Sequence, residues 1–322
     1  MTKSRWIALA LALACASLAA PALALDYPTR PIRWIVPYPP AGTTDTLARL
    51  MSKWLSDHLG QQVVIENKAG GGNNIGTELA LRSPPDGYTM LLVNPANGIN
   101  QTLYRNLNFD IVNDMAPVAG LVRTPNVMEV TSSFPAKNVA EFIAYCKANP
   151  GKINWASSGT GTSVHMSGEM FSMMTGCKML HVPYKGAGPA LVDLISGQVQ
   201  VMFDNLPSSI GHIKGGRLRA LAVTSTYHEP SLPGIPTIAE TVPGYEATAW
   251  FGIGMPRGTP REIVDKVNAE VNRALSDPEM QKRLADLGGK PIPGTPDDFG
   301  RVVASEVEKW GKVVKASGAT VD

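Results

Sequence analysis

The chain has 322 residues, of which 44% are hydrophobic, and it carries 29 Lys and Arg against 27 Asp and Glu. Two of the basic residues, Lys3 and Arg5, lie in a segment that we expect to be removed on export, so the mature chain has 27 of each sign and no net charge. Nucleic acid is therefore not an expected partner, because its binding needs clustered Lys and Arg. A chain of this length and composition can bury two hydrophobic cores.

The N-terminal segment 1–24 combines a basic end, a short Ala/Leu run and small residues up to Ala24. This pattern predicts a secretory signal peptide that is cleaved near Ala24. The apolar run ends at Pro21 and is too short to span a bilayer. A lipoprotein signal at Cys15 is the alternative, although Ala12 stands where a Leu is usual.

Short apolar segments alternate with amphipathic ones, which predicts an α/β fold with mostly parallel sheets. In the first series the expected strands are 32–38, 62–67 and 87–94. A helix that Gly60 ends follows the first strand, and a helix near 76–83 follows the Gly-rich segment after the second. A loop, 95–100, follows the third strand.

A second series of the same kind begins at a strand near 125–133. Its further expected strands are 153–159, 181–184, 199–205 and 218–225. Its expected helices are 139–149, 162–176 and 189–197. A strand near 250–256 and C-terminal helices follow, one of them beginning at a Thr295–Asp298 capping box. We therefore expect two lobes, one made of 26–126 with 247–322 and the other of 127–246.

Two cysteines remain in the mature chain, Cys146 and Cys177. Both are expected late on helices that flank the strand 153–159. A disulfide is plausible chemistry for an exported protein, so we predict that they are bridged. Two buried free thiols are the alternative.

Three strand-to-helix junctions share small and hydroxyl residues: Pro40–Asp45, Ser157–His165 and Lys185–Pro189. The N-terminus of a helix has unpaired N–H groups and a partial positive charge, so each junction could hold an anion without a cation. Such loops border the ligand crevice in open α/β sheets. In the alternative interpretation, Thr44, Thr162 and Ser163 only cap their own helices.

Enzyme motifs are absent from the sequence: there is no G-x-S-x-G, no H-E-x-x-H, no P-loop and no dinucleotide-binding spacing. Ser158, His165 and Asp204 could in principle form a hydrolytic triad, and Asp45 with Asp204 an acid–base pair. Nothing in the spacing requires either. We expect no catalytic activity, no metal and no cofactor.

Several segments closely resemble the Bug family, the periplasmic solute-binding proteins of tripartite tricarboxylate transporters. The resemblance runs in order through the mature chain, on stretches such as "YPTRPIRWIVPYPPAGTTDTLAR", "NPGKINWASSGTGTSVHMSGEMF" and "HVPYKGAGPALVDLISGQVQVMFDNLPS". It implies a periplasmic protein with two α/β lobes, a Venus flytrap, which closes on a small organic carboxylate. It also implies delivery of that ligand to the transporter's membrane subunits.

The resemblance further implies a set of ligand-binding residues from both lobes. They are Tyr38, Pro40, Ala41, Gly42, Thr43, Thr44 and Asp45 in the first, and Ser157, Ser158, Gly161, Thr162, Ser163, His165, Gly186, Ala187, Gly188 and Asp204 in the second. Three residues differ from the family pattern: Tyr38 is commonly Phe, and Ala41 and Asn73 stand at usual Gly positions. Ala41 is expected to add a methyl group near the carboxylate.

Two other functions compete with transport. One is a receptor that feeds a two-component sensor kinase, and the other is a periplasmic hydrolase. We expect a monomer, and the sequence does not identify which mono- or dicarboxylate is bound.

Overall fold

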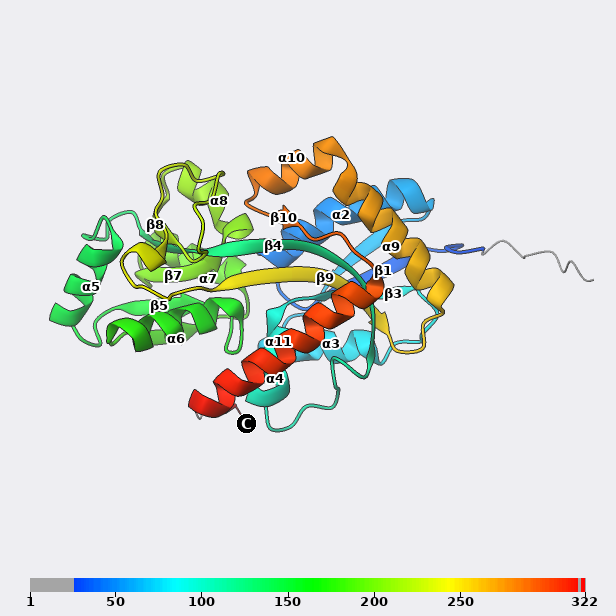
Figure 1. The fold of residues 1–322 in the computed structure, drawn as a ribbon, viewed down its shortest axis with the longest axis horizontal. Coiled ribbons are helices and arrows are strands. Elements are labelled where there is room, and N and C mark those ends of the chain that lie inside the picture. Colours follow the sequence, from blue (N-terminus) through cyan, green and yellow to red (C-terminus); the bar gives the residue numbers. More distant parts are fainter. Residues whose placement is uncertain (1–25, 318–319, 322) are drawn as a thin grey trace, which may run out of the picture.

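A computed structural model describes residues 26–317 and 320–321. The predicted signal peptide, with Cys15, lies outside the described residues. Strands and helices alternate along the described chain, which confirms the predicted α/β class (Figure 1). None of the helices within these ranges is long and apolar enough to cross a membrane.

The first group of strands lies on the right of Figure 1. Strand β1 (Ile32–Val36) pairs in parallel with β2 (Val63–Asn67) and β3 (Thr89–Val93), and β3 pairs antiparallel with β9 (Thr248–Pro256). The helices of this group are α2 (Thr43–Leu59), α3 (Asn74–Leu81), α4 (Pro95–Leu103), α9 (Arg261–Ser276), α10 (Pro278–Asp286) and α11 (Pro296–Ser317). Side chains of α2 and α9 pack with those of β1 and β9 in one hydrophobic core.

The second group lies on the left of Figure 1 and has its own core around Phe142, Trp155 and Phe203. Strand β5 (Asn154–Ser157) pairs in parallel with β6 (Leu180–Pro183) and β7 (Val201–Asn205). The remaining elements of the group are β8 (Leu218–Val223), α5 (Val139–Ala148), α6 (Ser163–Thr175), α7 (Ala187–Ser196) and α8 (Leu206–Lys214).

Two long strands run side by side between the groups (Figure 1). Strand β4 (Met115–Thr131) pairs antiparallel with β9 as far as Pro125, and from Asn126 onward it pairs with β7 and β8. Short β10 (Lys290–Pro291) also pairs with β4. The hydrogen-bonded path is therefore continuous and mixed, and parallel pairing is confined to the strands within each group. The 3₁₀ turns η1 (Gly71–Asn73) and η2 (Ile238–Glu240) complete the elements.

Two element predictions were wrong. Residues 95–100, expected to be a loop, begin helix α4. The Asn94 side chain accepts from the Ala96 N–H, and the Asn97 side chain accepts from the Asn94 N–H. Pro95 stands at the first helical position, where it favours the helix. The first half of β4 was also missed, because the sequence indicated a strand only from residue 125. Elsewhere the predicted boundaries are close, as at α2, which Gly60 ends in the left-handed conformation.

The two cysteines are free thiols in this structure, and both are buried in the core of the second group. The Cys146 thiol interacts with Cys177, so the two residues are neighbours as expected. Cys146 lies late on α5, but Cys177 follows the end of α6 and does not lie on a helix, so that part of the prediction was wrong. Burial, together with Cys177, raises the pKa of the Cys146 thiol to about 12. The structure thus has the thiols side by side but no bridge, and the disulfide stays a prediction.

Candidate functional site

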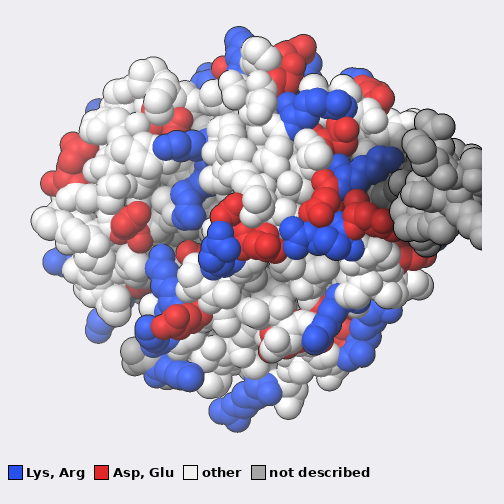
Figure 2. Space-filling view, turned by 45° about the vertical axis from the view of Figure 1, so that its right-hand side comes forward, with Lys and Arg blue, Asp and Glu red and all other residues white. Residues whose placement is uncertain are grey.

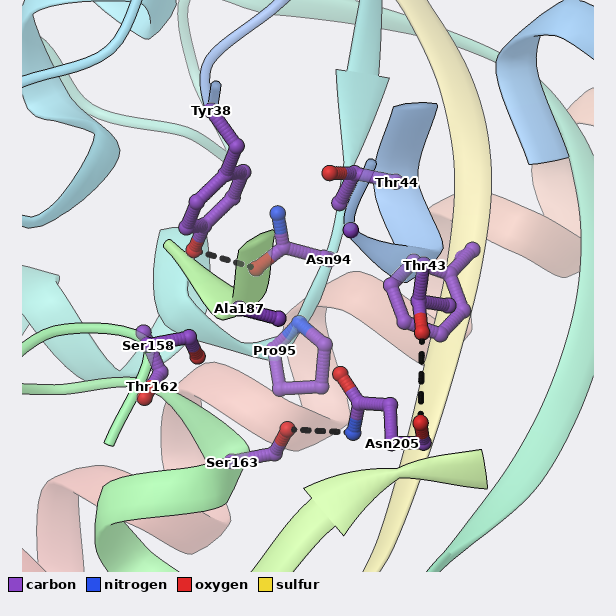
Figure 3. Close-up of a pocket in the computed structure, with 12 residues that line it drawn as sticks. Tyr38, Thr43, Thr44, Asn94, Pro95, Ser158, Thr162, Ser163, Ala187 and Asn205 are labelled. Carbon is purple, nitrogen blue, oxygen red and sulfur yellow. Dashed lines mark hydrogen bonds between the residues drawn. The ribbon is translucent and has the colours of Figure 1, made fainter. Parts of the chain in front are cut away.

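Five helices begin around one cavity, at the place where the two groups of strands face each other (Figure 3). The first residues of α2, α4, α6 and α7, and the residue before α8, contribute to its wall. The lining residues are Tyr38, Gly42, Thr43, Thr44, Asn94, Pro95, Ser158, Thr162, Ser163, Ala187, Asn205 and Phe251. Each helix N-terminus carries about half a positive elementary charge, so their convergence favours a bound anion.

The backbone donors at three of these N-termini have no side-chain cap. The capping positions Gly42 of α2, Gly186 of α7 and Asn205 of α8 form no side-chain capping hydrogen bond, whereas Asn94 caps α4 and Thr162 caps α6. First-turn N–H groups without a cap need another acceptor, such as a ligand oxygen. The uncapped helices thus supply donors from both groups of strands.

One of the three hydroxyl residues, Thr162, caps its helix and also lines the cavity. Thr162 Oγ1 accepts from the His165 N–H at 3.2 Å. Ser163 instead accepts from the Asn205 amide at 3.1 Å, and Thr44 forms no capping bond at α2. The Thr44 hydroxyl is therefore available to the cavity that it lines.

The two groups of strands are tightly closed over the cavity. The Thr43 and Ser208 hydroxyl oxygens are 3.0 Å apart across the gap, and the Ser208 N–H donates to Thr43 at 3.2 Å. Glycines make other approaches possible: a Cβ on Gly186 would lie 2.6 Å from Pro39 Cδ. The cavity volume is about 20 Å³, which is room for roughly one water molecule, so a larger ligand requires the groups to separate.

None of the described residues that line the cavity has a charged side chain. The nearby acid, Asp45, is turned to its own loop, where it accepts from Arg49, from the Asn67 amide and from the Ala41 N–H. Burial opposes ionisation of Asp45, but these hydrogen bonds outweigh it and lower its pKa. On the face in Figure 2, acidic and basic side chains are interspersed, and neither sign dominates.

About half of the predicted site residues line the cavity: Tyr38, Gly42, Thr43, Thr44, Ser158, Thr162, Ser163 and Ala187. The others lie outside its wall: Pro40, Ala41, Asp45, Ser157, Gly161, His165, Gly186, Gly188 and Asp204. Ala41 is exposed and has a left-handed φ of 70°. The Ala41 Cβ lies 3.7 Å from the point where a Cβ on Gly188 would stand. Its methyl group therefore faces α7 rather than the ligand space.

His165 lies behind the wall, in a stack of rings. It is parallel to Trp155, with ring centroids 5.8 Å apart, and it contacts His181 at 4.5 Å. Burial lowers the pKa of His165 to about 4, so the ring is neutral near pH 7. His165 therefore shapes the second lobe's wall from behind and does not reach into the cavity.

The hydrolytic triad is not assembled among the described residues. None of the hydrogen bonds there joins Ser158, His165 and Asp204. Asp204 is fully buried and interacts with the Ser208 and Ser209 hydroxyls, beside the second buried acid Glu129. Among the described residues its hydrogen-bond partners differ from those of Asp45, and no hydrogen bond joins the two acids as the acid–base pair that the sequence allowed.

Four lining residues were missed: Asn94, Pro95, Asn205 and Phe251. Asn94 follows β3 directly and Asn205 is the last residue of β7, and each stands at the capping position of the next helix, one or two residues before a Pro. That Asn–Pro spacing marks a helix start and could have identified both of them. Phe251 lies within β9 and gives no such signal.

Comparison with known proteins shows which family the chain belongs to. The sequence matches the "Tripartite tricarboxylate transporter family receptor" over residues 47–319. The chain belongs to this family. It is 37% identical to BugT of Bordetella pertussis over 95% of each chain, and 38% identical to a UPF0065 protein of Pseudomonas sp. strain P51 over 94% of this chain and 91% of that one. The resemblance to Bug proteins is thereby confirmed.

Solved structures of this receptor family share the fold. Rpa4515 of R. palustris, solved with adipate, has a TM-score of 0.89 at 41% identity and covers 92% of this chain and 100% of its own. MatC of Rhodopseudomonas palustris, solved with malate, has a TM-score of 0.85 at 32% identity over 89% and 100% of the two chains. This chain is accordingly a periplasmic solute-binding receptor in a family of binding proteins.

Proposed function

We propose that this receptor captures a small organic carboxylate between its two lobes and delivers it to the membrane subunits of a tripartite tricarboxylate transporter. The observation that carries the proposal is the convergence of five helix N-termini on one uncharged, hydroxyl-lined cavity. Carboxylates accept several N–H and O–H bonds at once, and such charge-assisted bonds are about twice as strong as neutral ones. The adipate and malate bound by two relatives are of this class.

In this proposal the lobes are residues 26–126 with 247–322, and 127–246. Strands β4 and β9 are the long connections between them, and the pairing of β4 changes partners between Pro125 and Asn126. Bending there would open the cavity, which is too small in the closed form to admit an organic acid. Thr43 and Ser208 would separate on opening and meet again on closure.

Export through a signal peptide at 1–24, action as a monomer, and binding without catalysis belong to the same proposal. Uncapped N-termini and the lack of an assembled triad support binding over hydrolysis. Delivery to a sensor kinase would use the same binding step. Permease genes beside the gene for this chain, rather than a kinase gene, would support transport.

The test is the substitution Thr44→Val, measured by calorimetric titration with acetate, malate, glutarate and adipate. Thr44 lines the cavity from the α2 N-terminus, and its hydroxyl is not used for capping. Loss of one hydrogen bond to a charged group corresponds to roughly a tenfold to hundredfold loss of affinity. We expect that loss for every carboxylate that the wild type binds.

Thr46→Val is the matched control, because Thr46 lies on the same helix but outside the cavity wall. Its affinity should equal that of the wild type. Equal affinities in Thr44→Val and the wild type, or tight binding of acetamide and adipamide, would contradict the carboxylate proposal.

A further inference from the structure

Asn94 lies at the junction between β3 and α4 and is only 4% exposed. Its Oδ1 accepts from the Ala96 N–H at 3.0 Å and from the Tyr38 hydroxyl at 3.4 Å. Its own backbone N–H donates to Asn97 Oδ1 at 2.9 Å. Three hydrogen bonds thus hold this residue at the first turn of α4.

These bonds also fix which end of the amide points inward. Turning the amide over would place its NH₂ group against the Ala96 N–H, with a donor facing a donor. Nδ2 must therefore point the other way, and there it is buried without a hydrogen-bond partner among the described residues. Buried amide donors are normally paired, so this one is open to an acceptor from outside the described residues.

The unpaired nitrogen belongs to a residue of the cavity wall. Figure 3 shows the Asn94 nitrogen turned away from Tyr38, on the side where the Thr44 hydroxyl lies. The uncapped N-terminus of α2 lines the same cavity. Amide, hydroxyl and backbone donors from the first group of strands therefore line one cavity.

We propose that Asn94 is a specificity-determining residue, whose amide N–H donates to the ligand carboxylate at the α2 N-terminus and selects it against the corresponding amide. A carboxylate offers acceptors on both oxygens, whereas a carboxamide would place its own NH₂ against these donors. The inference deepens the proposed function and rests on it. It identifies the ligand group at this end of the cavity as an acceptor-only carboxylate.

Tyr38 and Asn73 are positioning residues for this amide. The Asn73 amide lies 3.4 Å from the Tyr38 hydroxyl, which itself donates to Asn94 Oδ1. Burial raises the pKa of Tyr38, so the hydroxyl keeps the proton that it donates. With Phe at position 38, Asn94 Oδ1 would keep only the bond from Ala96.

The test is Asn94→Asp, titrated calorimetrically with acetate, malate and adipate and with acetamide and adipamide. Aspartate keeps the shape and the acceptor that caps α4, but it replaces the NH₂ donor by a charged oxygen. We expect carboxylate affinity to fall at least a hundredfold and the preference over amides to disappear. Tyr38→Phe should reduce the carboxylate-to-amide ratio by several fold, as expected of a positioning residue.

Asn138→Asp makes the same change at the N-cap of α5, where the side chain accepts from the Glu141 N–H, and it should bind like the wild type. If Asn94→Asp does not fold, Asn94→Ser replaces it, because serine also caps a helix but is too short to reach the ligand. A tenfold or larger loss of carboxylate affinity is then expected. Wild-type binding that persists in the folded Asn94 variant would overturn the role of Asn94 alone. A wild type that binds none of these carboxylates would overturn the proposed function as well.

Discussion

Two acids lie buried together beneath the contact between the lobes, Glu129 on β4 and Asp204 on β7. The Ser209 hydroxyl oxygen is 2.6 Å from Glu129 Oε1 and 3.0 Å from Asp204 Oδ2. Glu129 Oε2 and Asp204 Oδ1 are buried and have no hydrogen-bond partner among the described residues. Burial, and then the charge of Asp204, raise the pKa of Glu129 well above its usual value. Burial raises the pKa of Asp204 to about 6.

Glu129→Gln should therefore change how stability depends on pH. The folded pKa of Glu129 lies above the ordinary value of 4.5, so the folded state binds more protons than the unfolded state above that pH. The contribution of Glu129 is complete below pH 4.5 and is lost as pH rises toward the folded pKa, by about 1.4 kcal/mol for each pH unit. Glutamine keeps the shape and the acceptor for Ser209 but does not titrate. Relative to the wild type, the variant should gain unfolding free energy as the pH rises from 5 to 7, by at most about 1.4 kcal/mol for each pH unit.

The assay is urea unfolding of both proteins at pH 5, 6, 7 and 8. His165 and His181 also titrate, with pKa values that burial lowers to about 4 and about 3, and they destabilise the fold as pH falls. Both proteins contain them, so they cancel in the difference between the two curves, which reports the interacting pair Glu129 and Asp204. Glu279→Gln, at an exposed position of α10, is the control and should leave the pH dependence unchanged. A difference between Glu129→Gln and the wild type that stays constant from pH 5 to pH 7 would refute the reasoning.

The sequence indicated most of the fold because its local signals agree with the tertiary structure. The apolar spacing of α2, the left-handed Gly60 and the Thr295–Asp298 capping box each act within a few residues, and all three are present in the structure. The start of α4 was missed because "PANGIN" reads as a loop unless Asn94 is recognised as its cap. The first half of β4 takes its strand conformation from β9, which is more than a hundred residues away in sequence.

The sequence indicated the cavity residues at helix N-termini, which have a local pattern. It did not indicate residues such as Asn94, whose orientation depends on hydrogen bonds to other elements. Small and hydroxyl residues after a strand mark a helix N-terminus, and Gly42–Thr44 and Thr162–Ser163, predicted from this signal to bind the ligand, line the cavity. No local sequence pattern shows that the Asn94 nitrogen is unpaired. The orientation of the amide is set by the bonds that Asn94 Oδ1 accepts from Tyr38 and from Ala96 of α4. Asp204 was expected at the ligand because of the resemblance to the Bug family, whereas in the structure it interacts with the hydroxyls of Ser208 and Ser209 and lies outside the cavity wall.

Two further predictions concern the second lobe and its contact with the first. If the adjacent Cys146 and Cys177 are bridged in the exported protein, thiol titration of unreduced, denatured protein should find no free thiol, and reduction should release two; two free thiols before reduction would exclude the bridge. Thr43→Val should speed ligand release, because the Thr43 hydroxyl contacts the Ser208 hydroxyl at 3.0 Å, the Ser208 N–H at 3.2 Å and the Asn205 carbonyl at 3.4 Å, all across the closed gap. Each neutral hydrogen bond is worth about 1 kcal/mol, and loss of one or two of them in the closed form should raise the dissociation rate by roughly fivefold to thirtyfold in a stopped-flow displacement assay. Thr43→Ser keeps the hydroxyl and should release ligand at nearly the wild-type rate, so equal rates in Thr43→Val and Thr43→Ser would show that these bonds do not hold the lobes together.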